Sequence, residues 1–284
     1  MKKIFSVIFA AIALSFAAYC QTTSQEYLEK YSRLIQRLGY AGVGIETYLD
    51  KWEEAFPQDG RMLEARCNYY LAKSMTTEVV IREGSKFLGN KPVISLPDSS
   101  GRKINYFEEH FFDDEVFGTA VKYIDRAIQL YPLDILYRAD KVNLLLAYEK
   151  ESPDLAVAEI ENLVEMEQTS HPEWTFDGTP IEDGEFSQLI SGYCVSLYNV
   201  ASPISYDAFY SISRQMCKLE PKEPNWLDNI GSYWLVARGN DRKAMSFYKK
   251  ALKLNKEDQV AKSNISLIER RRAHAKKTAK GSRP

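Results

Sequence analysis

One spacing recurs along this chain and constrains its fold more than any other feature. In residues 239–255, GNDRKAMSFYKKALKLN, a small residue is followed by an aromatic four positions later and by a second small residue seven positions later. The same spacing of small and apolar residues begins at Ala120 and again at Ala156, 36 residues further on. Ala208 and Ala244 are also 36 residues apart. A period of this length with helical spacing inside it predicts repeated helical hairpins.

Each repeat has a candidate partner helix directly before it. The segment NWLDNIGSYWLVAR precedes Gly239, and DILYRADKVNLLLAYEK precedes the helix that contains Ala156. Both segments carry apolar residues at helical period. Gly239 suits a left-handed turn between two helices, and Ser152-Pro153-Asp154 predicts an N-cap followed by a first-turn proline. We expect the alanines to mark close helix contacts and Tyr248 to be a packing residue.

These residues resemble the tetratricopeptide repeat (TPR) family. The last unit matches its pattern at Leu227, Ile230, Gly231, Trp234, Gly239, Ala244, Tyr248 and Ala251, and the Ala120 unit supplies the closing Pro132. The mature chain as a whole is similar to exported bacterial TPR proteins. The resemblance implies an all-α, TPR-like solenoid of helical hairpins that binds proteins or peptides, without a reaction or a cofactor.

The first third of the chain reads as a weaker copy of the same pattern. Residues 27–57 predict one hairpin, and residues 62–74 begin another whose second helix is delayed until residue 116. Between them, VISLPDSSGRKINYF alternates apolar residues around a turn sequence and predicts a small β-hairpin. We therefore expect four to five hairpins over residues 21–276, with insertions at about 74–115 and 167–185.

The N-terminus has the layout of an export signal. Lys2 and Lys3 precede an apolar run that ends at Ala18 and is too short to span a bilayer, which predicts a signal peptide over residues 1–20. The mature protein is then expected in the periplasm or outside the cell, or tethered to a membrane if Cys20 is lipidated. Of the remaining cysteines, Cys194 and Cys217 either pair in an oxidising compartment or stay as buried thiols.

No catalytic motif is present in the sequence. It lacks the common hydrolase, phosphate-binding and paired-cysteine metal motifs, so we expect no enzyme activity, cofactor or metal. In EEHFFDDE, residues 108–115, the acids are read as a helix cap at Asp113 or Asp114, with a divalent cation as the alternative. The basic C-terminus follows a capping helix that begins near Asp258 and packs Val260, Ile265 and Ile268 inward, and residues 277–284 are expected to be a flexible tail.

Two surfaces are candidates for binding. If the repeat register is right, Tyr137, Lys141, Asp228 and Ser232 face a groove that would accept a protein or peptide, because export argues against nucleic acid. Alternatively, the loop at 167–185 offers Trp174 and Phe176 as a stacking platform for a glycan, although an aromatic in such a loop more often anchors the loop to the solenoid.

Overall fold

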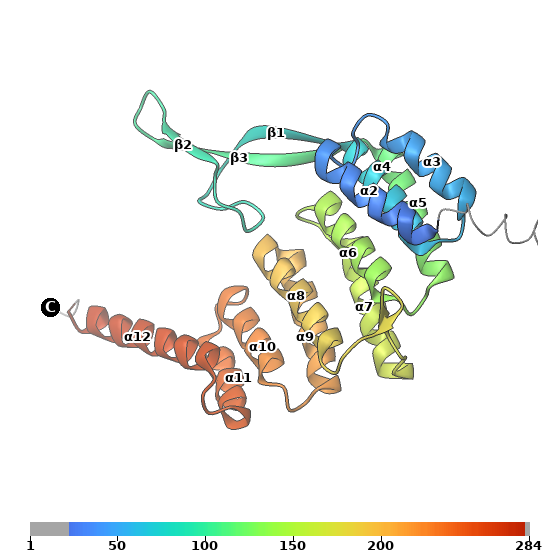
Figure 1. Ribbon diagram of the computed structural model, residues 1–284. Coiled ribbons are helices and arrows are strands. Elements are labelled where there is room, and N and C mark those ends of the chain that lie inside the picture. Colours follow the sequence, from blue (N-terminus) through green and yellow to red (C-terminus); the bar gives the residue numbers. More distant parts are fainter. Residues whose placement is uncertain (1–22, 282–284) are drawn as a thin grey trace, which may run out of the picture. The chain divides into compact units, whose positions relative to one another are not determined.

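A computed structural model describes the backbone of residues 23–281 and the side chains of residues 23–275. Eleven helices account for most of this described part, together with a three-stranded and a two-stranded sheet (Figure 1). The chain forms two compact units: residues up to Thr76 with Phe112–Pro132, and Thr77–Phe111 with the residues from Leu133 onward. The predicted signal peptide and Cys20 lie outside the described residues.

The first unit consists of two helical hairpins. Helices α2 (Ser24–Leu38) and α3 (Ile45–Ala55) form the first, and α4 (Gly60–Ser74) and α5 (Asp114–Leu130) form the second. Trp52 is fully buried, and its indole stacks on the Tyr27 ring at 6.0 Å between centroids. Buried Arg66 binds the carboxylates of Glu53 and Asp50 at 2.9 and 2.6 Å. The packing of α4 against α5 confirms the predicted second hairpin, whose two helices are separated by a long insertion.

The second unit continues the pattern with three more hairpins and a final helix. The pairs are α6 (Ile135–Glu149) with α7 (Asp154–Ser170), α8 (Glu185–Val200) with α9 (Pro203–Leu219), and α10 (Pro224–Val236) with α11 (Asp241–Leu254). Neighbouring hairpins pack through α7 with α9 and α9 with α10, and α12 (Gln259–Gly281) packs on α11. Consecutive hairpins that each contact the next give a TPR-like helical array.

The small residues of the repeat lie where helices meet. A Cβ added to Gly231 on α10 would lie 2.7 to 3.0 Å from three ring atoms of Tyr248 on α11. Tyr248 is itself fully buried, as are Ala244 and Ala251. Gly239 has a φ of +57°, the left-handed turn that the sequence predicted between α10 and α11. The close contact of α10 and α11 therefore depends on the absence of a side chain at position 231.

The insertion between α4 and α5 is a three-stranded sheet. The predicted β-hairpin is present as β2 (Ile94–Pro97) and β3 (Lys103–Phe112), which pair antiparallel with Ile94 opposite Tyr106. A further strand, β1 (Met75–Arg82), lies on the other side of β3, so the strand order is β1-β3-β2. β1 follows α4 directly, and β3 leads into α5.

The second insertion is a short loop held against α6. Its two-residue strands β4 (Thr175–Phe176) and β5 (Thr179–Pro180) pair around the turn at Asp177 and Gly178. Buried Asp134, the N-cap of α6, accepts hydrogen bonds from the backbone N–H groups of both turn residues, at 3.1 and 2.8 Å. One carboxylate therefore caps a helix and holds the loop at the same time.

The predicted cap of α5 is present, whereas the predicted cap of α7 is not. Asp113 caps α5 as predicted, by accepting from the Val116 N–H at 2.9 Å. Ser152 does not cap α7; the Glu149 carboxylate does, by accepting from the N–H groups of Leu155 and Ala156 at 2.7 and 2.8 Å. Helix α7 thus begins against the end of α6.

The final helix also departs from its predicted packing and boundary. Ile268 is buried and Ile265 is packed against the core, but Val260 is 51% exposed, because Ala261 takes the inward position. Helix α12 continues to Gly281, beyond the boundary expected at residue 276. Among the described helices, none combines the length and the apolar character needed to cross a membrane.

Candidate functional site

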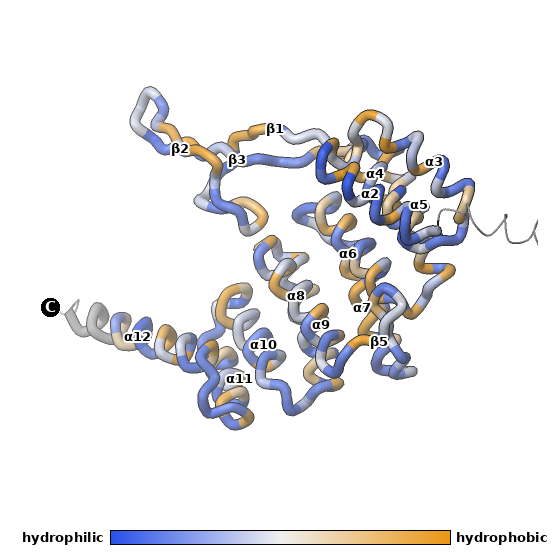
Figure 2. The backbone as a smooth tube through the Cα atoms, viewed as in Figure 1, coloured by the Kyte–Doolittle hydropathy of each residue, from blue (hydrophilic) through white to orange (hydrophobic). Residues whose placement is uncertain are grey.

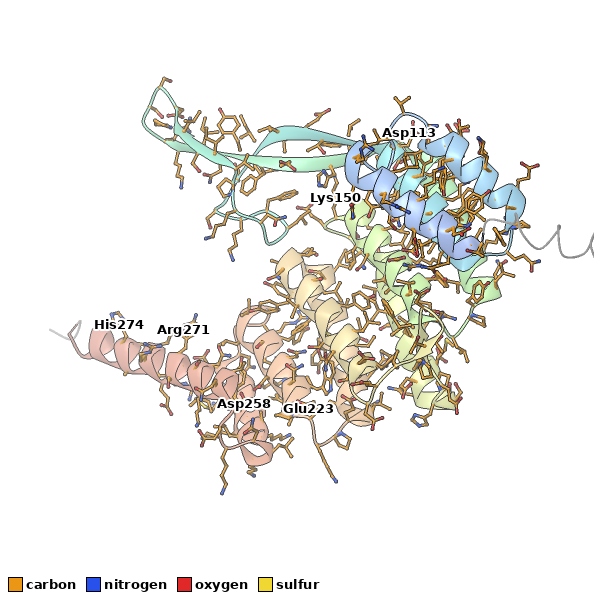
Figure 3. All side chains as sticks on the ribbon, viewed as in Figure 1. Asp113, Lys150, Glu223, Asp258, Arg271 and His274 are labelled. Carbon is orange, nitrogen blue, oxygen red and sulfur yellow. The ribbon has the colours of Figure 1, made fainter. Side chains whose placement is uncertain are left out.

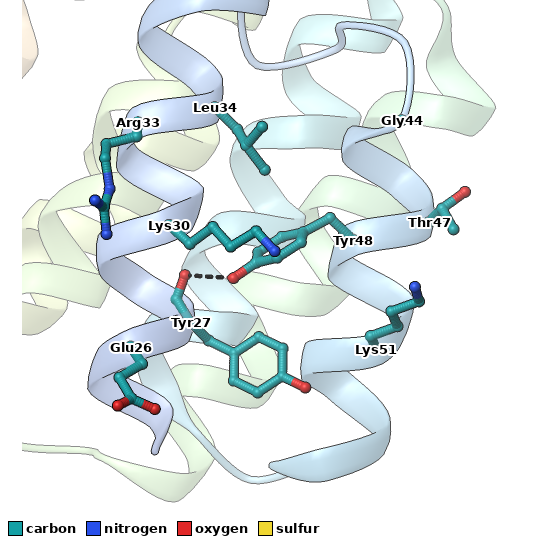
Figure 4. Close-up of a pocket in the computed structure, with 9 residues that line it drawn as sticks. All are labelled: Glu26, Tyr27, Lys30, Arg33, Leu34, Gly44, Thr47, Tyr48 and Lys51. Atoms are coloured by element: carbon teal, nitrogen blue, oxygen red, sulfur yellow. Dashed lines mark hydrogen bonds between the residues drawn. The ribbon is translucent and has the colours of Figure 1, made fainter. Parts of the chain in front are cut away.

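A groove lies between the two helices of the first hairpin. Its volume is about 720 Å³, and Figure 4 shows its nine lining residues; we call it the α2/α3 groove. The residues are Glu26, Tyr27, Lys30, Arg33 and Leu34 from α2, with Gly44, Thr47, Tyr48 and Lys51 from the start of α3 and the residue before it. Their spacing of three and four positions places each set on one face of its helix.

Two tyrosines form the wall of the α2/α3 groove. The rings of Tyr27 and Tyr48 lie 5.7 Å apart, and the Tyr48 hydroxyl donates to the Tyr27 backbone carbonyl at 2.9 Å (Figure 4). Burial, followed by the neighbouring Tyr27, raises the pKa of Tyr48 to about 12. The phenol therefore stays protonated at neutral pH and keeps donating this hydrogen bond, which fixes the ring across the groove.

The groove carries an excess of positive charge. Lys30, Arg33 and Lys51 are exposed, while Glu26 is the one acid among the nine lining residues. Glu26 already accepts the Thr23 N–H at 2.9 Å in the capping box at the start of α2. The chain as a whole has a formal net charge of −2, whereas this groove is positively charged. The positive charge of the groove favours an anionic ligand.

The three cations have few competing partners. The Lys30 ammonium lies 5.3 Å from the centroid of the Tyr48 ring, and Arg33 is 3.8 Å from Glu29, with both of these side chains largely exposed. Lys51 forms no ion pair with the described residues. Exposed ion pairs of this kind contribute at most about 1 kcal/mol, so a bound carboxylate can replace them at little cost.

A second hollow, between the start of α8 and the loop before α10, is chemically different. The Glu220 carboxylate accepts from the Ser187 hydroxyl and the Trp226 indole N–H, both at 2.7 Å. The Asn225 side chain donates to the Ser191 hydroxyl at 3.1 Å. Because these polar groups already satisfy one another, we interpret this hollow as a packing feature between helices.

The four predicted groove residues do not form one surface. Tyr137 on α6 and Asp228 on α10 are only 4% and 3% exposed, so the prediction that they line an open groove is wrong. Lys141 pairs with Glu159 on α7 at 2.5 Å, and the Ser232 hydroxyl is 3.1 Å from the Tyr248 hydroxyl. Both of these contacts join the two helices of one hairpin, α6 with α7 and α10 with α11.

Asp228 has a distinctive environment. Its buried Oδ1 has no hydrogen-bond partner among the described residues, and its carboxyl group lies beside that of Asp258 at the start of α12. Burial, followed by the neighbouring Asp258, raises the pKa of Asp228 to about 8. Asp258 accepts from the Ala261 N–H at 3.0 Å and so caps the start of α12. Both acids are buried, so the pair is not part of an open binding surface.

The two loop aromatics have opposite environments. Trp174 is 4% exposed, its indole stacks on Phe186 at 5.7 Å, and its N–H donates to Glu167 at 2.7 Å. It therefore anchors the loop and is not available as a stacking platform. Phe176 is 52% exposed and lies beside a shallow pocket at the β4–β5 turn, so it alone remains accessible.

The acidic segment before α5 is already occupied by protein contacts. Glu109 is 5% exposed and accepts from Arg82 and Lys150 at 2.7 and 2.6 Å, while Asp113 caps α5. In the part of the chain that the structure describes, no three histidine, cysteine or acidic side chains gather as metal ligands would. Cys67, Cys194 and Cys217 are free thiols.

Comparison with known proteins gives matches in structure and none in sequence. No protein-family model matches this sequence, and no curated protein matches it either. Among solved structures, the chain is similar to YrrB, described as a TPR protein with an unusual peptide-binding site. The two share 13% identity over 86% of this chain and 92% of YrrB, with a TM-score of 0.40. The hairpin architecture above rests on this chain's own helices and contacts.

Proposed function

We propose that this chain is an exported, non-catalytic scaffold that binds a protein or peptide partner in the bacterial cell envelope through the α2/α3 groove. The observation that carries the proposal is the combination of two fixed tyrosine rings with three exposed cations in one groove of a helical-hairpin array. The N-terminal apolar run after Lys2 and Lys3 supports export.

The chemistry of the groove favours a particular kind of partner segment. Tyrosine rings provide apolar area with little loss of conformational freedom on binding, and flanking lysines attract carboxylates. A partner segment with an aromatic or aliphatic side chain next to acidic residues, or a chain end with its terminal carboxylate, matches both features. We therefore expect an acidic segment that places its apolar side chain between Lys30 and Lys51.

The glycan-binding alternative loses its main support. It required two aromatic side chains on the 167–185 loop, and the Trp174 ring is used in packing against Phe186. One exposed phenylalanine without a second ring or a set of free polar groups is a poor sugar platform. The protein-binding proposal is therefore preferred.

A capture experiment from the envelope fraction of the parent cell tests the proposal. The full chain, Lys30→Glu/Lys51→Glu and the control Lys249→Glu/Lys256→Glu would be used as baits, because both variants change the net charge by the same amount. We expect a stoichiometric partner to be recovered by the full chain and the control, and to be lost with the groove variant. Equal recovery by all three baits would refute the groove as the binding site.

A further inference from the structure

The two edges of the three-stranded sheet are protected to different extents. Edge strands expose unpaired backbone groups, and proteins usually block them with short strands, proline or charged side chains, lysine above all. β2 has four residues and ends in Pro97, so that edge is blocked in this way. β1 has eight residues, MTTEVVIR, without proline, glycine or lysine. In the described part of the chain, the strand order gives β1 a neighbouring strand on one side only.

One face of the sheet is used by its own unit. Glu109 on β3 is buried and bridges Arg82 of β1 and Lys150. Lys150, labelled in Figure 3, lies directly after the end of α6. The Lys150 ammonium also lies 4.2 Å from the centroid of the Phe111 ring. Because alternate residues share a face, Glu78, Val80 and Arg82 point to this helix-facing side.

The opposite face is apolar and exposed. The Thr77 hydroxyl is 2.9 Å from Nδ1 of His110, which places these two residues together on the opposite face. Alternation along the strands and the β2–β3 register place six apolar residues on this opposite face. We call this side of the sheet the apolar face. The six residues are Val79, Ile81, Ile94, Leu96, Ile104 and Tyr106. In Figure 2, the tube of β1 and β2 carries orange, hydrophobic segments.

Exposure on the apolar face is greatest along β1. Val79 and Ile81 are 62% and 61% exposed, against 47% and 46% for Ile94 and Leu96 on β2. An apolar surface that reaches the unblocked edge of a sheet is a feature of strands that pair with another chain.

We propose that β1 pairs antiparallel with β1 of a second copy of this chain, with the two-fold axis passing through Val80. The sheets of the two copies then join into one sheet of six strands. A symmetric pairing of this kind uses the same patch on both copies, and it does not involve the α2/α3 groove.

Charge and apolar pattern select this register. In an edge strand, only alternate residues turn their backbone groups outward, so a strand can pair with its own copy only around a central residue. With Val80 at the centre, Glu78 lies opposite Arg82 of the other copy, and Val79 lies opposite Ile81. Both contacts occur twice by symmetry. Centres at Val79 or Ile81 would instead place Glu78 or Arg82 opposite Val80.

The pairing also gives Arg82 a second carboxylate partner. Its guanidinium already binds Glu109 on its own sheet through two N–H groups, and 44% of its side chain is exposed. A guanidinium has five N–H donors, so Arg82 can bind Glu78 of the second copy as well. On the other side of the sheet, the apolar faces of the two copies become continuous, with β1 at their centre.

Light scattering on the full chain from about 1 to about 200 µM tests the assembly, since a dimer depends on protein concentration. We expect a dimer that Glu78→Arg weakens by about tenfold or more, because like charges then face each other twice. Glu108→Arg, an equal charge change on the central strand β3, is the control and should leave the dimer unchanged. A chain that stays monomeric throughout this range, or a dimer that both variants weaken equally, overturns the proposal.

Disulfide trapping tests the register without changing charge. In a background with Cys20 and Cys217 replaced by serine, Val80→Cys should cross-link to itself on mild oxidation, because directly opposite residues lie within disulfide range. Val79→Cys and Ile81→Cys should cross-link when mixed and not alone, since like positions are then diagonal neighbours about 7–8 Å apart. Cross-linking of Val79→Cys alone, or none for Val80→Cys, overturns the register.

Discussion

Replacing Gly231 with alanine tests the close contact between α10 and α11. The added Cβ would lie 2.7 Å from one ring carbon of Tyr248 and 2.9 and 3.0 Å from two others. The ring has little room to move, because Tyr248 is fully buried and its hydroxyl is 3.1 Å from that of Ser232. The substitution therefore forces either the ring or the helix out of place.

Two opposing effects set the size of the change. Overpacking of a well-packed site costs about 1–3 kcal/mol, whereas alanine favours a helix over glycine by about 1 kcal/mol. The 2.7 Å contact with a buried ring puts the overpacking cost in the upper half of its range, so we expect Gly231→Ala to lower the free energy of unfolding by about 1–2 kcal/mol. Gly192, an exposed glycine within α8, is the matched control, because a Cβ there meets nothing within 4 Å. Gly192→Ala should raise the free energy of unfolding by about 0.4–1 kcal/mol.

Urea unfolding followed by circular dichroism at 222 nm measures both variants against the parent protein. The two substitutions should change the free energy of unfolding in opposite directions, although each adds the same methyl group to a helix of the same unit. If Gly231→Ala were as stabilising as Gly192→Ala, α10 and α11 would not approach each other as closely as the structure places them. The assignment of Gly231 as a packing residue of the hairpin would then fail.

Three further changes probe the helix ends and the second loop. The raised pKa of Asp228 means that the folded protein keeps a proton that the unfolded chain releases. The free energy of unfolding should therefore fall as pH rises from about 4 to about 8, by at most about 1.4 kcal/mol per pH unit. Asp228→Asn should flatten that slope in urea titrations, and parallel pH profiles for both proteins would contradict this. Trp174→Ala should cost about 3–5 kcal/mol and expose residues 171–182 to limited proteolysis, whereas Phe176→Ala should change neither. Glu149→Ala should cost about 1 kcal/mol through the lost cap of α7, while Ser152→Ala should be nearly neutral in the same urea assay.

The helical hairpins could be predicted from the sequence because their signals are local. Ala244, Tyr248 and Ala251 share a helix face, Gly239 marks the turn, and Asp113 precedes its helix directly. The same holds for the β2–β3 hairpin, whose turn sequence stands between two short alternating runs. Each of these elements depends on residues within a few positions of one another.

The parts that were missed depend on contacts between distant segments. β1 follows α4 without any glycine or proline to mark the change, and it is a strand because β3 pairs with it. Glu149 caps α7 from the end of the preceding helix, and Asp134 holds a loop more than 40 residues away. Such roles depend on tertiary structure, which local sequence patterns do not determine.

The candidate site was misplaced for a related reason. The repeat register predicts Tyr137 and Asp228 in a groove, but the register alone does not say which helix faces are covered by neighbouring elements. The α2/α3 groove had a detectable signal, since Tyr27 and Lys30 share one face of their helix while Tyr48 and Lys51 share one of theirs. That signal becomes informative only once the two helices are known to pack together.

Calorimetry at about 50 and about 300 mM salt measures the affinity of the purified chain for the captured partner and shows whether the α2/α3 groove binds it. If the α2/α3 groove binds an acidic segment, Lys30→Glu/Lys51→Glu should raise the Kd at least about tenfold at low salt, and added salt should weaken binding to the parent chain. The Lys249→Glu/Lys256→Glu control should bind as the parent does. A Kd unchanged by the groove variant would contradict the account.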